Sequence, residues 1–581
     1  MHPILTFLKS RVLPKQRITT SPRQKLALAA LLLWLFGSQL YLAKTISTTT
    51  DEHVHIASGY MALTRHNFRF DADHPPLAKY LFALPVLLAH PNLPPGGEQL
   101  WDEAAPTVND SWIDSREWAD RWWYATPGND PQHLIFLGRL AAVLITTALG
   151  LSLYLLGKRI HPPQLGLFTL FFAATNPLLL GHGYLANTDV PLVFSATLAI
   201  HALITFWEKR TLRSAVWVGL ATALVLTTKT SGLGMLAPIG LTLIAFAWRR
   251  PFKTWAPHVA LAILSAWIGI WAVYQFRSPF VPWPDITKAW GYNDPNYAPY
   301  IHYYRDVEAI APKIRLILPM DYSKSVLMLV INGQFPRKFT YLLGENQVSH
   351  LYYPVAYAVK TPIAISLITL FGLVGWWGMA LRRRPFRVPV GITLLIITSG
   401  VYTVSALLSK LQIGLRHAMV PIILSSFIAA WFMVKAYTKP NLRPLATILL
   451  IIGCVLPTVA SFPYYLGYID PLFLKLKPKW YYLADSNVDW GQQSGEVADL
   501  LKQHFPDQPV AANWLWSPYQ LQAEGLTVVD LDPENPPANM PVLVTSQQLS
   551  TRVEYLRYRS IEPVLKTGDD SAFIYYFGSV R

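Results

Sequence analysis

The chain consists largely of apolar blocks that are long enough to cross a membrane. Between Leu26 and Ile46, the only charged residue is Lys44. A helix of that length spans roughly 30 Å, the thickness of the hydrocarbon core of a bilayer. A signal peptide is the weaker interpretation, because the block is long and no small-residue cleavage site follows it. Because similar blocks come later and only 14% of the residues are charged, the sequence predicts a polytopic α-helical membrane protein.

Basic residues separate the blocks and give the chain a formal net charge of +15. Almost no acidic residues accompany them, with Glu208 as the exception. Short loops rich in Lys and Arg face the cytoplasm, so this charge follows membrane topology and does not indicate a nucleic-acid partner. The basic residues are Lys9, Arg11, Lys15, Arg17, Arg23, Lys25, Lys158, Arg159, Lys209, Arg210, Arg213, Arg249, Arg250, Lys253, Arg382, Arg383, Arg384, Arg387, Lys435, Lys439 and Arg443.

Threading the chain through these basic clusters predicts a membrane domain, 26–466, of about eleven helices. With the N-terminal segment 1–25 in the cytoplasm, an odd number of spans places the C-terminus outside and every basic cluster inside. The predicted spans are 26–46, 134–156, 165–181, 190–207, 214–229, 232–248, 257–275, 355–381, 389–408, 417–436 and 445–466.

Three segments on the predicted outer side are too long to be simple turns: 47–133, 276–354 and the tail 467–581. In the tail, SGEVADLLKQHF has apolar residues at helical spacing, whereas LTVVDL and MPVLVTS are typical of strands. We therefore expect the tail to form a small α/β domain. The only cysteine, Cys454, lies in an apolar segment, so no intrachain disulfide can form.

The first outer segment opens with an acidic pair directly after the first apolar block. The stretch TISTTTDEHVHIASGY, residues 45–60, carries Asp51 and Glu52. A charged carboxylate at the bilayer centre costs at least about 2.5 kcal/mol, so we expect both acids to emerge at the membrane interface. They are compatible with a functional site, and equally with simple capping of the next helix.

A second stretch of the same segment, DADHPPLAKYLFALP, places His74 and Lys79 around a Pro-Pro pair. Proline is favoured in the first turn of a helix, where free N–H groups and the helix dipole attract anions. A cation beside such a helix start suits a phosphate group. A surface helix with a proline start is the alternative.

A third candidate, Asp189, stands at the predicted outer mouth of a span, on the same membrane face as Asp51. Two carboxylates that converge at one face can bind a metal or share acid/base chemistry. Helix capping is again the alternative. Cations near outer span ends suit a lipid phosphate, although snorkelling explains any single one. They are Arg139, Lys229 and Arg416, with His417 beside the last.

These stretches together resemble a known family. TTTDEHVHIASGY followed by DADHPPLAKYLFALP is similar to the first outer loop of the protein O-mannosyltransferase-like glycosyltransferases (family 39 type). That family belongs to the C-type superfamily of membrane enzymes that use polyprenyl-phosphate sugars. Segments 341–362 and 483–493 (LADSNVDWGQQ) also resemble bacterial members. The matching residues are Asp51, Glu52, His74, Pro75, Pro76 and Asp189.

The resemblance implies a C-type glycosyltransferase fold with large outer loops. It also implies an inverting transfer of a hexose or pentose from a polyprenyl-phosphate donor to a protein, lipid or glycan acceptor. The implied location is a bacterial inner (plasma) membrane, with the active site facing outward.

In that reaction Asp51 is the expected general base, assisted by Glu52 and Asp189. Cations stabilise the charge that builds on the departing phosphate. Those expected to contact the donor phosphate are His74, Lys79, Arg139, Lys229 and Arg416. The implied chemistry requires no definite cofactor, and a divalent metal bound by Asp51 and Asp189 stays open.

Two other classes of protein share parts of this pattern. A transporter or flippase of a lipid-linked sugar also has many spans and intramembrane charges, but its charges lie near mid-span on broken helices. The distinctive acids here lie at predicted outer span ends. A receptor or scaffold that uses the tail as a binding module is the third possibility.

Overall fold

The computed structural model describes residues 21–68, 70–71, 73–94, 112–160, 163–277, 317–334, 340–381, 389–517 and 519–578. Most of the predicted cytoplasmic segment 1–25 and much of the predicted outer segment 276–354 lie outside the described residues.

The predicted helical membrane fold is confirmed. Within the described ranges, eight helices are long and apolar enough to cross a membrane. They are α2 (Pro22–Thr45), α7 (Pro131–Ile160), α10 (Asp189–Lys209), η2 (Thr230–Met235) with α12 (Leu236–Ala247), α13 (Phe252–Val273), α19 (Val390–Leu408), η4 (Leu415–Ala418) with α20 (Met419–Tyr437), and Pro440–Ala460, which joins η5 (Pro440–Leu442), α21 (Arg443–Leu450), η6 (Ile451–Val455) and α22 (Leu456–Ala460).

Three further predicted spans, 165–181, 214–229 and 355–381, overlap shorter apolar helices, and the first and last of them are wrong as continuous helices because each contains a break. The shorter helices are α8 (Pro163–Ala174), α11 (Leu212–Thr228) and α18 (Ile363–Leu381). The apolar run that contains α8 breaks because the Asn176 side chain accepts a hydrogen bond from Leu178 N and caps a new helix, α9 (Pro177–His182), whose first residue is proline. The count of eleven crossings stays a prediction.

Small residues allow the helices of the bundle to approach closely. Helix α11 packs along α13, and a Cβ at Gly219 of α11 would collide with the Ser265 side chain and the Ala262 carbonyl of α13. Such contacts are typical of helix pairs in membranes, where van der Waals packing drives association. The outer face of α13 exposes Ile263, Leu264 and Ile268, as expected for a surface in contact with lipid.

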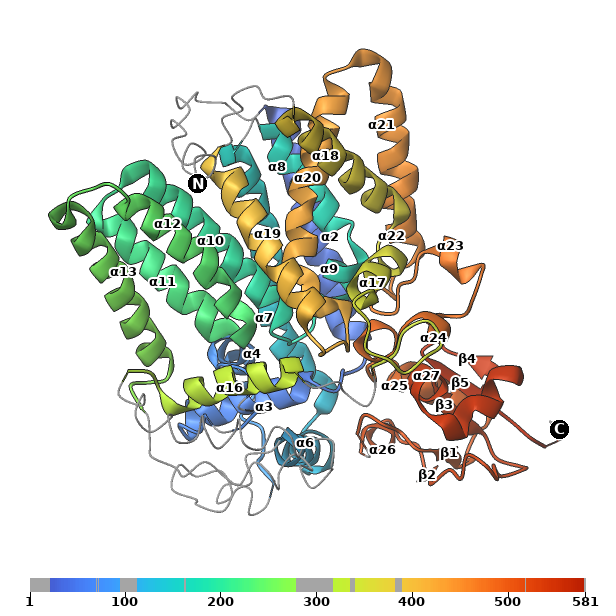
Figure 1. Cartoon of the computed structure of the whole chain (residues 1–581). Helices are drawn as coiled ribbons and strands as arrows, with labels where there is room; N and C mark the ends of the chain where they lie inside the picture. The colour runs from blue at the N-terminus through green and yellow to red at the C-terminus, as the bar shows by residue number, and fades with distance from the viewer. Residues whose placement is uncertain are drawn as a thin grey trace.

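A layer of shorter helices covers one end of the bundle (Figure 1). It contains α3 (Glu52–Thr64), α4 (Leu77–Leu87), α6 (Trp112–Asp120), η1 (Arg121–Ala125) and α16 (Met320–Gln334). Its core is aromatic: Phe70 and Trp118 pack edge to face, and Trp122 and Trp123 are fully buried. Helix α17 (Tyr352–Lys360) lies where the bundle meets the C-terminal domain.

The C-terminal tail forms the predicted α/β domain. Its sheet has the order β2-β1-β3-β5-β4; β1 runs parallel to β2 and β3, and β5 runs antiparallel to β3 and β4. The elements are α23 (Pro471–Leu474), α24 (Lys479–Tyr482), η7 (Asp485–Asn487), α25 (Ser494–His504), β1 (Val510–Ala512), α26 (Gln520–Ala523), β2 (Val528–Val529), β3 (Val542–Thr545), α27 (Ser546–Thr551), η8 (Val553–Ser560), β4 (Leu565–Lys566) and β5 (Ala572–Tyr575).

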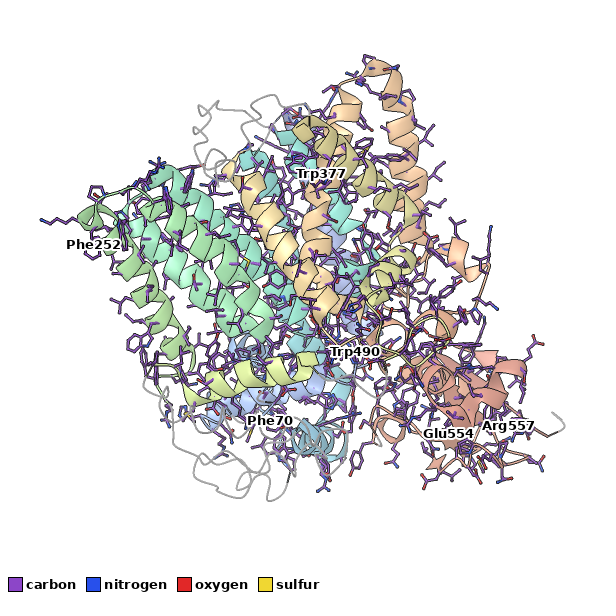
Figure 2. All side chains as sticks on the ribbon, in the orientation of Figure 1. Phe70, Phe252, Trp377, Trp490, Glu554 and Arg557 are labelled. Atoms are coloured by element: carbon purple, nitrogen blue, oxygen red, sulfur yellow. The ribbon has the colours of Figure 1, made fainter. Side chains whose placement is uncertain are left out.

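The C-terminal domain adjoins the end of the bundle that carries the short-helix layer (Figure 1). Trp490 lies at this junction, whereas Glu554 and Arg557 lie on the far side of the domain (Figure 2). The basic ends of α7 and α10, which carry Arg159 and Lys209, are at the opposite end of the bundle. The sequence-predicted acids therefore lie at the end next to the C-terminal domain.

Candidate active site

The turn after α2 brings Asp51 to a cluster of charged side chains. Asp51 occupies the N-cap position of α3, yet its side chain makes no capping hydrogen bond. Its Oδ2 accepts instead from Nη2 of Arg416 at 3.3 Å. Helix capping therefore does not account for this carboxylate.

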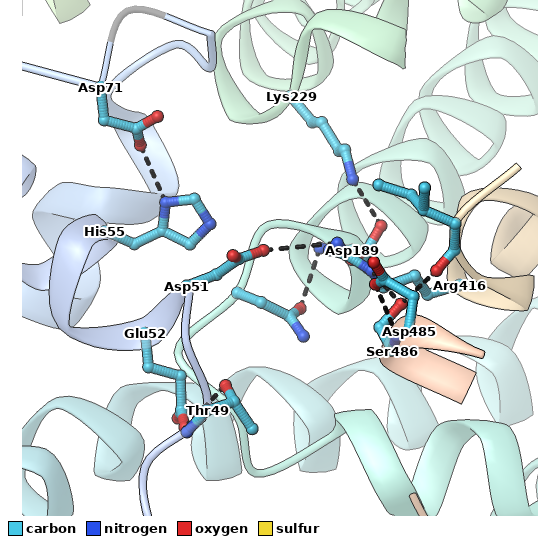
Figure 3. Close-up of polar contacts among 12 residues, drawn as sticks. Thr49, Asp51, Glu52, His55, Asp71, Asp189, Lys229, Arg416, Asp485 and Ser486 are labelled. Carbon is cyan, nitrogen blue, oxygen red and sulfur yellow. Dashed lines mark hydrogen bonds and ion pairs between the residues drawn. The ribbon is translucent and has the colours of Figure 1, made fainter. Parts of the chain in front are cut away.

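Arg416 also contacts the second predicted carboxylate. Its Nη1 donates to Asp189 Oδ2 at 3.3 Å, so one guanidinium joins Asp51 and Asp189 (Figure 3). Arg416 comes from η4, at the start of α20, and Asp189 is the first residue of α10. The structure thus brings together acids that are far apart in the sequence, and their link is a buried cation.

Lys229, the residue after α11, completes this cluster. Its ammonium donates to Asp189 Oδ1 at 2.5 Å. The side chains of Asp189 and Lys229 are almost fully buried, whereas the Asp51 side chain keeps 16% of its surface exposed. Asp51 is therefore the accessible carboxylate of the cluster, and Asp189 is already neutralised by two cations.

Glu52 points away from this cluster and into the protein. Its carboxylate, fully buried, accepts from Nε of Arg139 at 2.8 Å and Nη2 at 2.6 Å, from Thr49 N and from Ala186 N. Burial acts to raise the pKa of Glu52, but the Arg139 guanidinium outweighs it and lowers the pKa below its usual value. The remaining N–H groups of Arg139 donate to backbone carbonyls of Ala43, Ile46 and Ser47.

Lys79 is enclosed in the same way. Its ammonium lies 2.8 Å from Asp71 Oδ2 and donates to the carbonyls of Asp71 and His74. His55 Nδ1 lies 2.9 Å from the same Asp71 oxygen. Burial acts to raise the pKa of Asp71, but Lys79 and His55 outweigh it and hold the pKa below its ordinary range. This network joins Asp71, His74 and the start of α4 to His55 of α3.

The predicted phosphate ligands therefore fall into two groups. Lys79 and Arg139 have their donors taken up by buried partners. Lys229, Arg416 and His74 belong to one neighbourhood, and His417 joins them. His74 and His417 are partly buried, and His74 Nδ1 and His417 Nε2 lack a hydrogen-bond partner among the described residues. These two ring nitrogens are therefore unused polar atoms, whereas the N–H groups of Lys79 and Arg139 all have partners.

The geometry does not fit a divalent metal held by Asp51 and Asp189. Arg416 lies between their carboxylates, and Lys229 contacts Asp189, so an added dication would meet two buried cations. In the part of the chain that the structure describes, no group of three or more His, Cys, Asp or Glu side chains could hold a metal ion.

Sequence reasoning did not assign the residues that surround Arg416. Ser486 Oγ accepts from Arg416 Nε at 3.0 Å, and the ring of Trp490 lies 4.2 Å from the guanidinium carbon. Figure 3 shows Ser486 and Asp485 beside Arg416. Asp485, Ser486 and Trp490 all come from the LADSNVDWGQQ stretch. The only sequence feature that indicated this stretch was its resemblance to the family.

These features define an integral membrane protein with a charged, largely buried site at one end of its helix bundle. Residues 132–273 match the sequence model of the dolichyl-phosphate-mannose-protein mannosyltransferase family. The match confirms the predicted resemblance: the chain is similar to the protein O-mannosyltransferase-like membrane glycosyltransferases. A search among curated protein sequences finds no match.

A search among solved structures finds matches of low sequence identity. ArnT from Cupriavidus metallidurans bound to undecaprenyl phosphate is 12% identical, over 95% of this chain and 97% of ArnT, with a TM-score of 0.43. The Archaeoglobus fulgidus oligosaccharyltransferase, in complex with Zn and sulfate, is 12% identical over 86% of this chain and 62% of its own, with a TM-score of 0.39. The Saccharomyces cerevisiae Pmt1–Pmt2 complex bound to the sugar donor is 17% identical over 44% and 34%, with a TM-score of 0.32.

Proposed function

We propose that the protein transfers a sugar from a polyprenyl-phosphate donor to an acceptor hydroxyl, with inversion, at the outer face of a bacterial inner membrane. The observation that carries this proposal is the Asp51–Arg416–Asp189–Lys229 cluster, in which an accessible carboxylate adjoins buried cations. The description of the matched family, which names a dolichyl-phosphate sugar, supports a lipid-phosphate donor.

In this proposal Asp51 is the general base. It takes the proton of the acceptor hydroxyl as the oxygen attacks the anomeric carbon, and the bond to the phosphate oxygen breaks on the opposite face. The side-chain exposure of Asp51 supports this role because a base must reach its proton. Asp189 keeps Arg416 and Lys229 in place.

The departing phosphate gains negative charge, and Arg416 and Lys229 stabilise it, with His74 and His417 as hydrogen-bond partners. A lipid phosphate is already a good leaving group, so a nucleotide site is not needed. Glu52, Arg139 and Lys79 act as positioning residues in this scheme, because their charged groups face buried partners. The acceptor class, whether protein, lipid or glycan, is left open.

The test is isotope transfer from a polyprenyl-phosphate sugar to acceptors in membranes that contain the wild-type protein or Asp51→Asn. This substitution keeps the shape and removes the base, so turnover should fall by about 10²–10⁴-fold. Donor binding should persist because it depends on the cations. Near-normal turnover by a folded Asp51→Asn protein would exclude the assignment.

The transporter alternative predicts a different result in the same experiment. A flippase would move the lipid-linked sugar across the bilayer without forming a new glycosidic bond, so labelled donor would change sides and stay intact. A matched control is Asp532→Asn, because Asp532 is an exposed carboxylate close to Glu534, which bonds Arg557 on the far side of the C-terminal domain. Its transfer rate should equal that of the wild type.

A further inference from the structure

We propose that the 485–490 segment of the C-terminal domain positions Arg416, so that the active site is shared between the membrane domain and that domain. The inference rests on the proposed function. It gives the LADSNVDWGQQ stretch, 483–493, a positioning role in the site.

Ser486 has a hydroxyl with a fixed orientation. It donates its single proton to the carbonyl of Ile413 at 2.8 Å, so a lone pair faces Arg416 Nε at 3.0 Å. A Cβ at Gly414 would collide with this hydroxyl, so the close approach requires a glycine there. Because Nε is taken by Ser486, the two Nη groups are the ones that face Asp51 and Asp189.

Trp490 presents the face of its ring to the same guanidinium. Its ring centroid lies 4.2 Å from the Arg416 Cζ, and the side chain is 1% exposed. A cation over an aromatic face is attracted more strongly when both groups are desolvated. The ring thus holds the guanidinium carbon from one side, while Ser486 holds the Nε group.

The same segment also holds the backbone that carries Asp51. The Trp490 carbonyl accepts from Thr50 N at 3.1 Å, directly before Asp51. On the other side, Asn487 Oδ1 accepts from Leu415 N at 2.9 Å, directly before Arg416. Residues 485–490 therefore connect the backbone next to Asp51 with the backbone next to Arg416, the two residues of the ion pair.

Nearby contacts reinforce this bridge. Gly495 N donates to Ser47 Oγ at 2.9 Å, and Gln520 Nε2 donates to the Thr48 carbonyl at 2.9 Å. The turn between α2 and α3 is thus hydrogen-bonded to the C-terminal domain at several successive residues. A site built from the membrane helices alone would lack these constraints on Asp51 and Arg416.

The first experiment compares Ser486→Ala, Ser486→Thr and Ser550→Ala in the full-length protein. Ser550 is a matched control, because its buried hydroxyl bonds the carbonyls of Trp480 and Ser546 in the same domain, away from Arg416. Loss of a hydrogen bond to a charged group should lower kcat/KM about tenfold or more in Ser486→Ala. Ser486→Thr should restore the rate, and Ser550→Ala should match the wild type at equal thermal stability.

The second experiment separates this inference from the proposed function. A structure of Ser486→Ala, determined without substrate, should show the Arg416 guanidinium rotated away from Asp51 or Asp189. An unchanged Arg416, or a rate no lower than that of Ser550→Ala, would overturn the positioning role. Failure of the wild-type protein to transfer sugar would instead overturn the proposed function and leave the structural test decisive.

Discussion

The buried Glu52–Arg139 pair offers a sharp test of which acid performs chemistry. Arg139→Met removes a guanidinium that is fully buried and leaves the Glu52 carboxylate with only Thr49 and Ala186 as donors. Breaking a buried ion pair from one side costs about 3–5 kcal/mol. The unfolding entropy is about 2.1 cal/mol/K per residue. If all 581 residues unfold cooperatively, this loss of free energy lowers the Tm of Arg139→Met by about 2–4 °C.

The double variant Glu52→Gln/Arg139→Met removes both charges together. It should recover much of the lost stability, because replacing both members of a buried pair is far less costly than removing one. Intrinsic tryptophan fluorescence during heating measures the Tm of the purified wild-type protein, of Arg139→Met and of the double variant. Isotope transfer measures their turnover.

Because Glu52 is assigned a positioning role, the double variant should retain turnover when its Tm is restored. A stable but inactive double variant would refute this assignment and return Glu52 to the catalytic residues. Equal Tm losses in the single and double variants would refute the ion-pair reasoning itself. Because the pKa of Glu52 is lowered in the folded protein, its stabilisation is present above the unfolded value of about 4.3 and is lost as pH falls toward the folded pKa.

Three further predictions address the C-terminal domain, the phosphate ligands and the topology. Burial raises the pKa of Asp489 to about 7, so stability should fall as pH rises from about 4 to 7. Asp489→Asn should flatten this pH dependence in Tm measurements at several pH values, and turnover should continue. Loss of turnover in this variant would show that the C-terminal domain takes part in the chemistry. His74→Ala should weaken donor binding in a Kd measurement at nearly wild-type Tm, whereas Lys79→Ala should mainly lower Tm; the reverse pattern would return Lys79 to the phosphate site. In a Cys454→Ala background, cysteines at Arg23 and the exposed Val553 should be labelled from opposite sides of the membrane, and labelling from one side would exclude the predicted topology.

The helices were largely predictable because long apolar blocks have few other stable forms in a bilayer. Two breaks within predicted spans were missed, although local residues signal both. Asn176 and Pro177 begin a new helix inside 165–181. Pro362 separates α17 from α18 inside 355–381, because a residue before proline is disfavoured in the α conformation.

The site was predictable only in part. Motif order indicated that Asp51 and Asp189 belong together, and the structure brings both to Arg416. The sequence could not predict that Lys79 and Arg139 are buried in ion pairs, because burial of a cation depends on partners supplied by tertiary packing. Ser486 was missed for a related reason: its contact with Arg416 joins residues 70 positions apart, and a lone serine carries no chemical signature.

The charge balance of the cluster connects the base to the leaving group. Asp51 and Asp189 offset Arg416 and Lys229, so the four side chains are neutral together before the donor binds. During the proposed transfer, the phosphodiester becomes a monoester and gains one negative charge, while Asp51 loses one by taking the acceptor proton. The total charge of the site therefore stays constant through the step, which matters because unbalanced charge is costly where water is excluded. As Asp51 becomes neutral, the charge of Arg416 is no longer offset by that carboxylate and stabilises the phosphate instead. Because Ser486 and Trp490 hold the guanidinium in place, this change of partner requires no turn of the Arg416 side chain.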